Sequence, residues 1–137
     1  FTFTANNGFL SSPAVAVSLT ITPAHAMDVS GQVSVLRGDF RYRRATNTFA
    51  QLVTLTNTST ASLAGPLALA LDQLSLNARL ANASGTTVAT LPAGSPFVTV
   101  SSSSLAPGAS VSVLLSFSDL NFRRITYATR ILSGNGN

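Results

Sequence analysis

The sequence predicts an all-β protein, an antiparallel β-sandwich that is preceded by a β-hairpin. Three segments, 14–22, 49–57 and 110–117, alternate apolar and polar side chains in the period-2 pattern of half-buried strands. Turn-forming residues separate these and similar segments at intervals of about 8 to 12 residues, which is typical of a sandwich. Helix has little support, since only residues 67–80 place Leu side chains at helical spacing, and their neighbours favour a strand, a loop and a strand.

The N-terminal segment, residues 1–23, is predicted to be a β-hairpin. Residues 1–4 alternate Phe and Thr, residues 5–8 read Ala-Asn-Asn-Gly as a turn, and the second strand covers residues 14–22. A lone hairpin is only marginally stable in water, so its apolar stripe needs a partner sheet. We expect the stripe to be an interface formed by Phe1, Phe3, Val15, Val17, Leu19 and Ile21.

The rest of the chain, residues 28–137, carries enough strands for a complete sandwich. The predicted strands are 29–37, 39–45, 48–57, 66–72, 77–82, 96–101, 109–117 and 125–132. Alternation along them predicts inward side chains at Val33, Val35, Val53, Leu55, Leu67, Leu69, Val98, Val100, Val111, Val113, Leu115 and Phe117. Leu114 tests the register of its strand, because it should face away from the core.

The composition argues against most enzymes. All eight cations are Arg and all four acids are Asp, and the 137 residues include no Lys, Glu, Cys or Trp. Glycosidases need paired carboxyl groups, and a Ser-His-Asp site would depend on His25, which lies in the segment between the two parts. We therefore expect no catalytic residue and no cofactor. No run reaches the roughly 18 apolar residues of a membrane helix, so we expect no membrane span.

The sequence contains only weak indications of a metal site and of an adhesion motif. A calcium site would have to combine Asp119 and Asn121 with Asp28 or Asp39, but the chain has no D-x-D-x-D loop. The tripeptide Arg37-Gly38-Asp39 spells an integrin-type motif, which requires a protruding loop and occurs often by chance. We expect no metal.

The Arg residues form two groups with Arg79 between them: Arg37, Arg41, Arg43 and Arg44, then Arg123, Arg124 and Arg130. Alternation places Arg41 and Arg43 on one face of a predicted hairpin, and four Asp residues leave few partners for internal ion pairs. We expect Arg41 and Arg43 to face solvent as part of an interface. Short groups of this kind in strands are typical of solvated faces, so we expect no nucleic-acid partner despite a net charge of +4.

Aromatic residues near the first Arg group provide one candidate ligand surface. Phe40 and Tyr42, with the nearby Arg residues, could stack on sugar rings. The competing interpretation is that the aromatic residues are mainly structural, with both Tyr hydroxyls in water at the rim. The core in that interpretation includes Phe40, Phe49, Phe97 and Phe117.

Two parts of the chain resemble bacterial extracellular repeats. Residues 1–22, FTFTANNGFLSSPAVAVSLTIT, resemble the last two strands of a cadherin-like or immunoglobulin-like repeat, with Asn7 where such repeats commonly have an Asp that can bind calcium. The segments 49–72, 105–117 and 125–132 resemble C-terminal immunoglobulin-like modules of secreted and surface proteins. The resemblance implies an immunoglobulin-like sandwich over 28–137. Residues 1–23 would be either the end of an upstream repeat or a strand-donating arm.

We expect a non-catalytic structural or adhesive module of a bacterial extracellular surface assembly. Strands with few charges and no Lys are poorly guarded against edge pairing, which favours self-association or contact with neighbouring immunoglobulin-like domains. One form of this is a filament subunit joined by β-strand addition, with the hairpin docked in cis or in trans. The alternative is a carbohydrate-binding module of a secreted enzyme. A carbohydrate-binding module would have a polysaccharide as its partner, whereas an adhesive module could bind a host surface.

Overall fold

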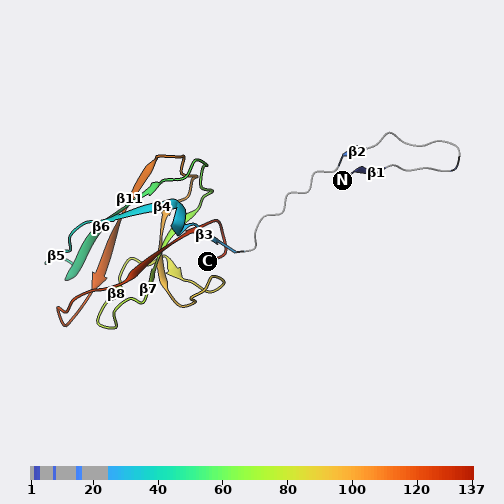
Figure 1. The fold of residues 1–137 in the computed structure, drawn as a ribbon. Helices are drawn as coiled ribbons and strands as arrows, with labels where there is room; N and C mark the ends of the chain where they lie inside the picture. The colour runs from blue at the N-terminus through green and yellow to red at the C-terminus, as the bar shows by residue number, and fades with distance from the viewer. Residues whose placement is uncertain (1, 4–7, 9–14, 17–24) are drawn as a thin grey trace.

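The computed structural model describes residues 2–3, 8, 15–16 and 25–137. Near the N-terminus, β1 (Thr2–Phe3) pairs antiparallel with β2 (Val15–Ala16), in the region of the predicted hairpin (Figure 1). Of the predicted apolar stripe, Phe1, Val17, Leu19 and Ile21 lie outside the described residues. The stripe therefore stays a prediction.

Two antiparallel sheets pack face to face in the remainder of the chain, as the sequence predicts (Figure 1). The first, here called the β7 sheet, has the order β3 (Met27–Asp28), β12 (Ala128–Ser133), β7 (Leu67–Asp72), β10 (Pro96–Ser101), β9 (Gly85–Thr86). The second, the β6 sheet, has the order β4 (Val33–Arg37), β6 (Thr48–Asn57), β11 (Ser110–Ser118), β8 (Arg79–Leu80). The short β5 (Arg41–Arg43) also pairs with β6, and one 3-10 turn, η1 (Ser30–Gln32), precedes β4.

The predicted core is confirmed by the burial of its side chains. Eight of the twelve residues are buried, and Val35, Val100, Val111 and Val113 are half-buried against them. Leu115 is fully buried, while Leu114 is 39% exposed, so the register of β11 is confirmed. Each fully buried aliphatic side chain stabilises the fold by about 1.5 to 3 kcal/mol relative to an exposed one.

Strand β7 lies at the centre of its sheet, between β12 and β10. Its Leu side chains face the main core, and Ala68 and Ala70 are buried on the opposite face with Leu132. A strand covered on both faces is apolar throughout, and for this reason its periodicity resembles that of a buried helix. No helix among the described residues is long and apolar enough to cross a membrane.

The outer face of the β7 sheet is covered in part by the segment between β9 and β10. Arg130 on β12 donates bidentate hydrogen bonds to the carboxylate of Asp72, with Nε–Oδ2 and Nη2–Oδ1 distances of 2.9 and 3.0 Å. Its Nη1 and Nη2 also donate to the carbonyl oxygens of Leu91 and Pro92, at 2.7 and 2.9 Å. Arg130 is buried, so it fastens this segment to the sheet and does not belong with the exposed Arg group in which the sequence places it.

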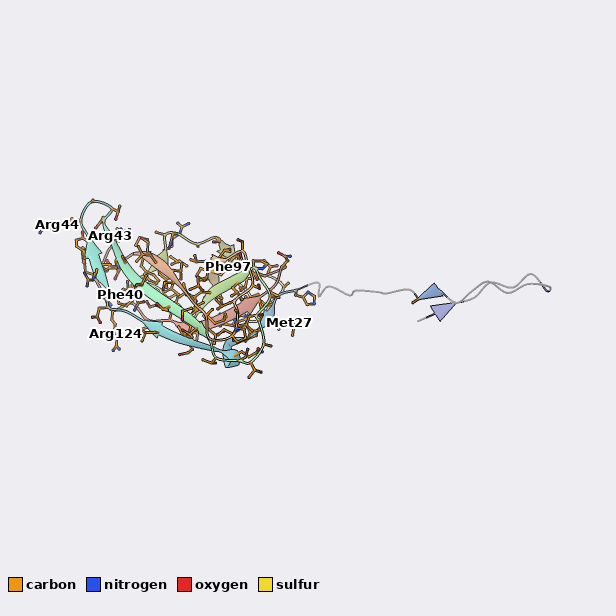
Figure 2. All side chains as sticks on the ribbon, turned by 90° about the horizontal axis from the view of Figure 1, so that it is seen from above. Met27, Phe40, Arg43, Arg44, Phe97 and Arg124 are labelled. Carbon is orange, nitrogen blue, oxygen red and sulfur yellow. The ribbon has the colours of Figure 1, made fainter. Side chains whose placement is uncertain are left out.

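The two ends of the sandwich differ in character. Figure 2 shows Phe40, Arg43, Arg44 and Arg124 gathered toward one end, and Met27 toward the other. The turn between β5 and β6 closes at Asn47, whose φ of +50° suits an Asn side chain, and the hydroxyl of Tyr42 donates to Asn47 Oδ1 at 2.7 Å. This turn holds the aromatic residues of the Arg-rich end.

Candidate functional site

At the Arg-rich end, the inward positions of two strands change from apolar to polar. Arg37 follows Val35 on the inward face of β4, and Gln51 lies between Phe49 and Val53 on the inward face of β6. The interior between the two sheets therefore ends in hydrogen-bonding side chains.

Gln51 ties this end together through its side-chain amide. It is buried, and its Oε1 accepts a short hydrogen bond from the hydroxyl of Tyr127. Its Nε2 donates to the carbonyl oxygen of Gly38 at 2.7 Å. Burial raises the pKa of the Tyr127 hydroxyl, and the positive charge of Arg37 opposes this only in part. Tyr127 is therefore a neutral hydrogen-bond donor at physiological pH.

Arg37 lies on top of the Tyr127 ring, with its guanidinium carbon 4.6 Å from the ring centre. Its Nη1 donates to the carbonyl oxygen of Tyr127 at 3.1 Å, and its Nη2 donates to Thr129 Oγ1 at 3.3 Å. A guanidinium has five N–H groups, so three of them have no acceptor among the described residues. Arg37 is thus oriented in advance and still able to bind an anion.

The loop between β11 and β12 is held by the carboxylate of Asp119. Asp119 is only 4% exposed, and it accepts hydrogen bonds from the backbone N–H groups of Asn121 and Arg123 and from Asn77 Nδ2. The three distances are 2.9, 2.7 and 3.0 Å. Burial by itself would raise the pKa of Asp119, but these hydrogen bonds outweigh it and leave the pKa below the usual value of 3.8. The carboxylate is therefore charged at neutral pH and fixes the backbone of the loop.

Phe122 occupies the position between the two backbone donors and has a φ of +52°. This left-handed conformation is uncommon for a bulky side chain. The ring remains 62% exposed and contacts Tyr42 and Phe49, with centroid distances of 5.4 and 5.6 Å. Tyr42 and Phe49 lie 5.2 Å apart, so three rings from two segments form one cluster.

A pocket of ≈ 570 Å³ opens beside this cluster, and we call it the arginine–aromatic pocket. It is lined by Arg37, Phe40, Phe49, Gln51, Arg123, Arg124, Ile125, Thr126 and Tyr127. Its volume lies within the range of about 300 to 1,000 Å³ that is usual for small-molecule sites. The lining combines three guanidinium groups with three rings and contains no acidic residue. Chemically, it can bind an anion that also presents an apolar face.

The predicted ligand residues are separated in the structure. Phe40 is 37% exposed, lines the pocket and packs edge-on against Phe117. Tyr42 does not line the pocket, and its ring packs against Phe49 and Phe122. Arg41 and Arg43 are exposed, as predicted, on the outer face of the β6 sheet opposite Ala50 and Thr48. Their role as an interface stays a prediction.

The expectation that both Tyr hydroxyls lie in water is corrected for Tyr127, which is buried with its hydroxyl bonded to Gln51, whereas Tyr42 is exposed. Within the tripeptide 37–39, the Gly38 N–H donates to the carbonyl oxygen of Leu52 at 2.8 Å, and the Arg37 side chain lies over Tyr127. This segment is tied into the sandwich and is not a protruding loop.

Two of the acidic residues considered for a calcium site accept hydrogen bonds from nearby donors. The carboxylate of Asp119 accepts from backbone N–H groups of the loop, and Asp28 accepts from the backbone N–H and hydroxyl of Ser30. The described residues contain no cluster of three acidic or His side chains that could hold a metal ion. His25 is exposed at the beginning of the described segment 25–137.

Sequence reasoning missed the positions of Arg37 and Gln51 in this site. Both occupy inward positions in strands whose other inward residues are apolar, and a polar residue there is a signal of function that alternation can reveal. No sequence pattern indicates that Arg37 and Gln51 contact Tyr127. Arg37 and Tyr127 are 90 positions apart, and only the packing of the two sheets brings them together.

No protein-family model matches the chain, and a search of curated proteins finds no match.

Proposed function

We propose that this chain is a non-catalytic adhesive module of a bacterial extracellular surface assembly, and that it attaches to an anionic partner through the arginine–aromatic pocket. The observation that carries the proposal is the convergence of Arg37, Arg123 and Arg124 on one pocket whose lining has no acid. Arg and aromatic side chains are the residue types enriched at binding surfaces.

The distribution of charge supports an anionic partner. The described residues contain one ion pair, between Arg130 and Asp72, and the Asp119 carboxylate is occupied by amide donors. This leaves no acidic partner, within the described part of the chain, for Arg41, Arg43, Arg44, Arg79, Arg123 and Arg124. All but Arg79 belong to the segments that build the Arg-rich end. Such a concentration of one sign steers and selects an oppositely charged surface.

The test measures retention of the purified chain on coated sensor surfaces. The surfaces carry dextran, carboxymethyl dextran or poly-glutamate, and the variants are the triple Arg37→Gln, Arg123→Gln, Arg124→Gln and the single Arg79→Gln. We expect the chain to bind at least one of the two anionic surfaces and to pass over neutral dextran. The triple variant should lose this binding, and Arg79→Gln, whose side chain lies outside the pocket, should keep it. Equal retention of the triple variant, or no retention of the chain on any anionic surface, would overturn the proposal.

A second candidate function, self-association by β-strand addition, is favoured by the edge of the β6 sheet. Strand β4 is five residues long at that edge, whereas β3, β8 and β9 at the other edges have two residues each. Leu36 on β4 is 70% exposed, and the strand contains no Lys or Pro to discourage pairing. A neighbouring copy could add a strand there, which would link subunits into a filament.

A further inference from the structure

We infer that the arginine–aromatic pocket binds a sugar residue that bears a carboxylate, as in an acidic polysaccharide. This inference rests on the proposed function and names the class of anion that the pocket takes. Such a sugar would use both kinds of side chain in the lining. The guanidinium groups would bind the carboxylate, and the aromatic rings would pack against the apolar face of the sugar ring.

The carboxylate is matched by Arg37. A guanidinium binds a carboxylate through two parallel N–H···O bonds, and Arg37 keeps three N–H groups for such a contact. Its position is fixed by the Tyr127 ring at 4.6 Å and by hydrogen bonds to Tyr127 and Thr129. Since little side-chain freedom remains to be lost, the entropic cost of binding is low.

Arg123 and Arg124, from the loop between β11 and β12, supply a second source of positive charge in the lining. Their side chains are exposed, but the Arg123 backbone is held by Asp119 at 2.7 Å. The loop thus presents both guanidinium groups from a fixed backbone, while their side chains stay free to adapt. This arrangement suits a chain of acidic sugars, because adjacent residues of such a polymer carry carboxylates at a regular spacing.

The aromatic rings of the lining favour a sugar over a small inorganic anion. Phe40 is partly exposed in the pocket and Phe49 also lines it, so these two rings can contact a sugar, whereas the Tyr127 ring is already covered by Arg37 and stacked on Phe117. Aromatic rings pack against the C–H face of a sugar, and the charged edge of the same sugar then reaches the guanidinium groups. An isolated sulfate or phosphate would use the Arg residues and leave the rings unused.

An acidic peptide fits the pocket less well than an acidic sugar. Extended peptides gain most of their affinity from main-chain hydrogen bonds to a strand edge. The backbone at the end of β4 has no such groups to offer at Gly38, whose N–H and carbonyl are bonded to Leu52 and Gln51. The remaining lining is made of side chains and of loop 123–127.

The test is calorimetric titration of the full chain with acidic tetrasaccharides. The probes are tetragalacturonate, an alginate tetramer, the methyl ester of tetragalacturonate, tetraglutamate and a single-stranded DNA tetramer. The methyl ester keeps the sugar rings and removes only the charge. We expect the chain to bind at least one acidic tetrasaccharide. The parent chain should bind the methyl ester, and the Arg37→Gln variant should bind the acid, about 10- to 100-fold more weakly. This is the loss that corresponds to a charge-assisted hydrogen bond.

Three further variants separate recognition from folding. Arg124→Gln changes an exposed side chain that makes no hydrogen bond among the described residues, so it should weaken binding without altering the thermal transition. Phe40→Ala should weaken binding of the tetrasaccharide more than binding of tetraglutamate. Arg79→Gln removes the same charge outside the pocket and should have little effect.

The outcomes distinguish the two proposals. Binding of tetraglutamate or DNA with no binding of an acidic sugar would overturn this inference and leave the adhesive function intact. Equal binding of the acid and its methyl ester, or an equal loss in Arg79→Gln and Arg124→Gln, would also overturn it. If no probe binds and the chain also fails on the anionic sensor surfaces, both proposals are wrong.

Discussion

At the scale of single residues, the hydrogen bonds of Gln51 connect the two sheets at the Arg-rich end. Its amide oxygen accepts from Tyr127 beside β12, and its amide nitrogen donates to Gly38 after β4. Because Gln51 and Tyr127 are buried, neither group could exchange its partner for water at low cost. The orientation of the Tyr127 ring, and with it the position of Arg37, depends on this amide.

Gln51→Leu is expected to destabilise the chain by about 1 to 3 kcal/mol, because it leaves the Tyr127 hydroxyl and the Gly38 carbonyl without partners. Urea denaturation measures the change in the free energy of unfolding. Tyr127→Phe is the matched control, since it removes one of the two hydrogen bonds and should cost less. A Gln51→Leu variant as stable as the parent chain would show that the amide bonds are not needed.

Because of the Tyr127 hydroxyl, the free energy of unfolding should depend on pH in the alkaline range. Burial raises its pKa in the folded state above the ordinary value of 10.0, so the unfolded chain loses its proton first as the pH rises. The contribution is present in full below pH 10.0 and is lost as the pH rises through the folded pKa. In urea titrations above that pH, the parent chain should lose stability more steeply than Tyr127→Phe. Parallel curves would contradict this assignment.

Phe122 marks the limit of residue-scale prediction. Its position beside two Arg residues is evident in the sequence, but its positive φ is not, because the conformation is imposed by Asp119 three positions earlier. Side chains on regular strands could be assigned to a face from alternation alone. Those in the loop could not, since their direction depends on hydrogen bonds that have no periodic pattern.

At the scale of elements, alternation identified β6 and β11 because each has one largely apolar face. The two strands pair over eight residues, from Phe49 opposite Phe117 to Thr56 opposite Ser110, and their inward aliphatic residues are the predicted ones. The segment between β9 and β10 was not predicted to cover a sheet. Its attachment includes two hydrogen bonds from the side chain of Arg130, whose neighbours in sequence suggest exposure.

Arg130→Met is expected to destabilise the chain by about 3 kcal/mol, because it leaves the half-buried Asp72 carboxylate and two carbonyl groups without their donor. Urea denaturation measures this, and limited proteolysis should show earlier cleavage in residues 87–95. The double variant Arg130→Met, Asp72→Leu removes both charges and should recover part of the loss. No recovery would mean that the loss of stability comes from the two carbonyl groups and not from the unpaired carboxylate.

Asp119→Asn is expected to loosen the loop between β11 and β12 without unfolding the sandwich. The amide retains one oxygen and so loses an acceptor for the Asn121 or Arg123 N–H, which should speed hydrogen exchange there. In the parent chain the lowered pKa means that this stabilisation is present above pH 3.8 and is lost as the pH falls through the folded pKa. Exchange in the variant should lack that acid dependence. Unchanged exchange at neutral pH would show that the carboxylate is dispensable.

At the scale of the whole molecule, the sequence predicted the sandwich but not the site. The fold follows from local patterns repeated along the chain, which act in the same way in every strand. The arginine–aromatic pocket requires segments 37–51 and 123–127 to meet, and this depends on the order of strands in both sheets. Such an order is a property of the complete packing, which no single segment specifies.

Self-association is tested at the same scale by negative-stain microscopy and sedimentation. If β4 accepts a strand from a neighbour, Leu36→Lys should reduce association by placing a charge on that edge. Leu52→Lys is the matched control, because Leu52 is 51% exposed on the outer face of a central strand. The double variant Val17→Asp, Leu19→Asp should prevent association if the hairpin is the donor, with residues 28–133 remaining folded. Association that survives all three variants would exclude this route.

The pairing of β3 with β12 determines how the module would respond to a mechanical load. Figure 2 shows Met27 at the end of the sandwich away from the Arg-rich end, so a force applied between these two ends would cross the sandwich. Strand β3 is held by two residue pairs with β12, supplemented by the Val29 N–H bond to the Ile131 carbonyl at 2.9 Å. A pull directed along β3 would load these bonds together in shear. In the proposed function, their rupture would release β3 while the arginine–aromatic pocket stays bound to its partner.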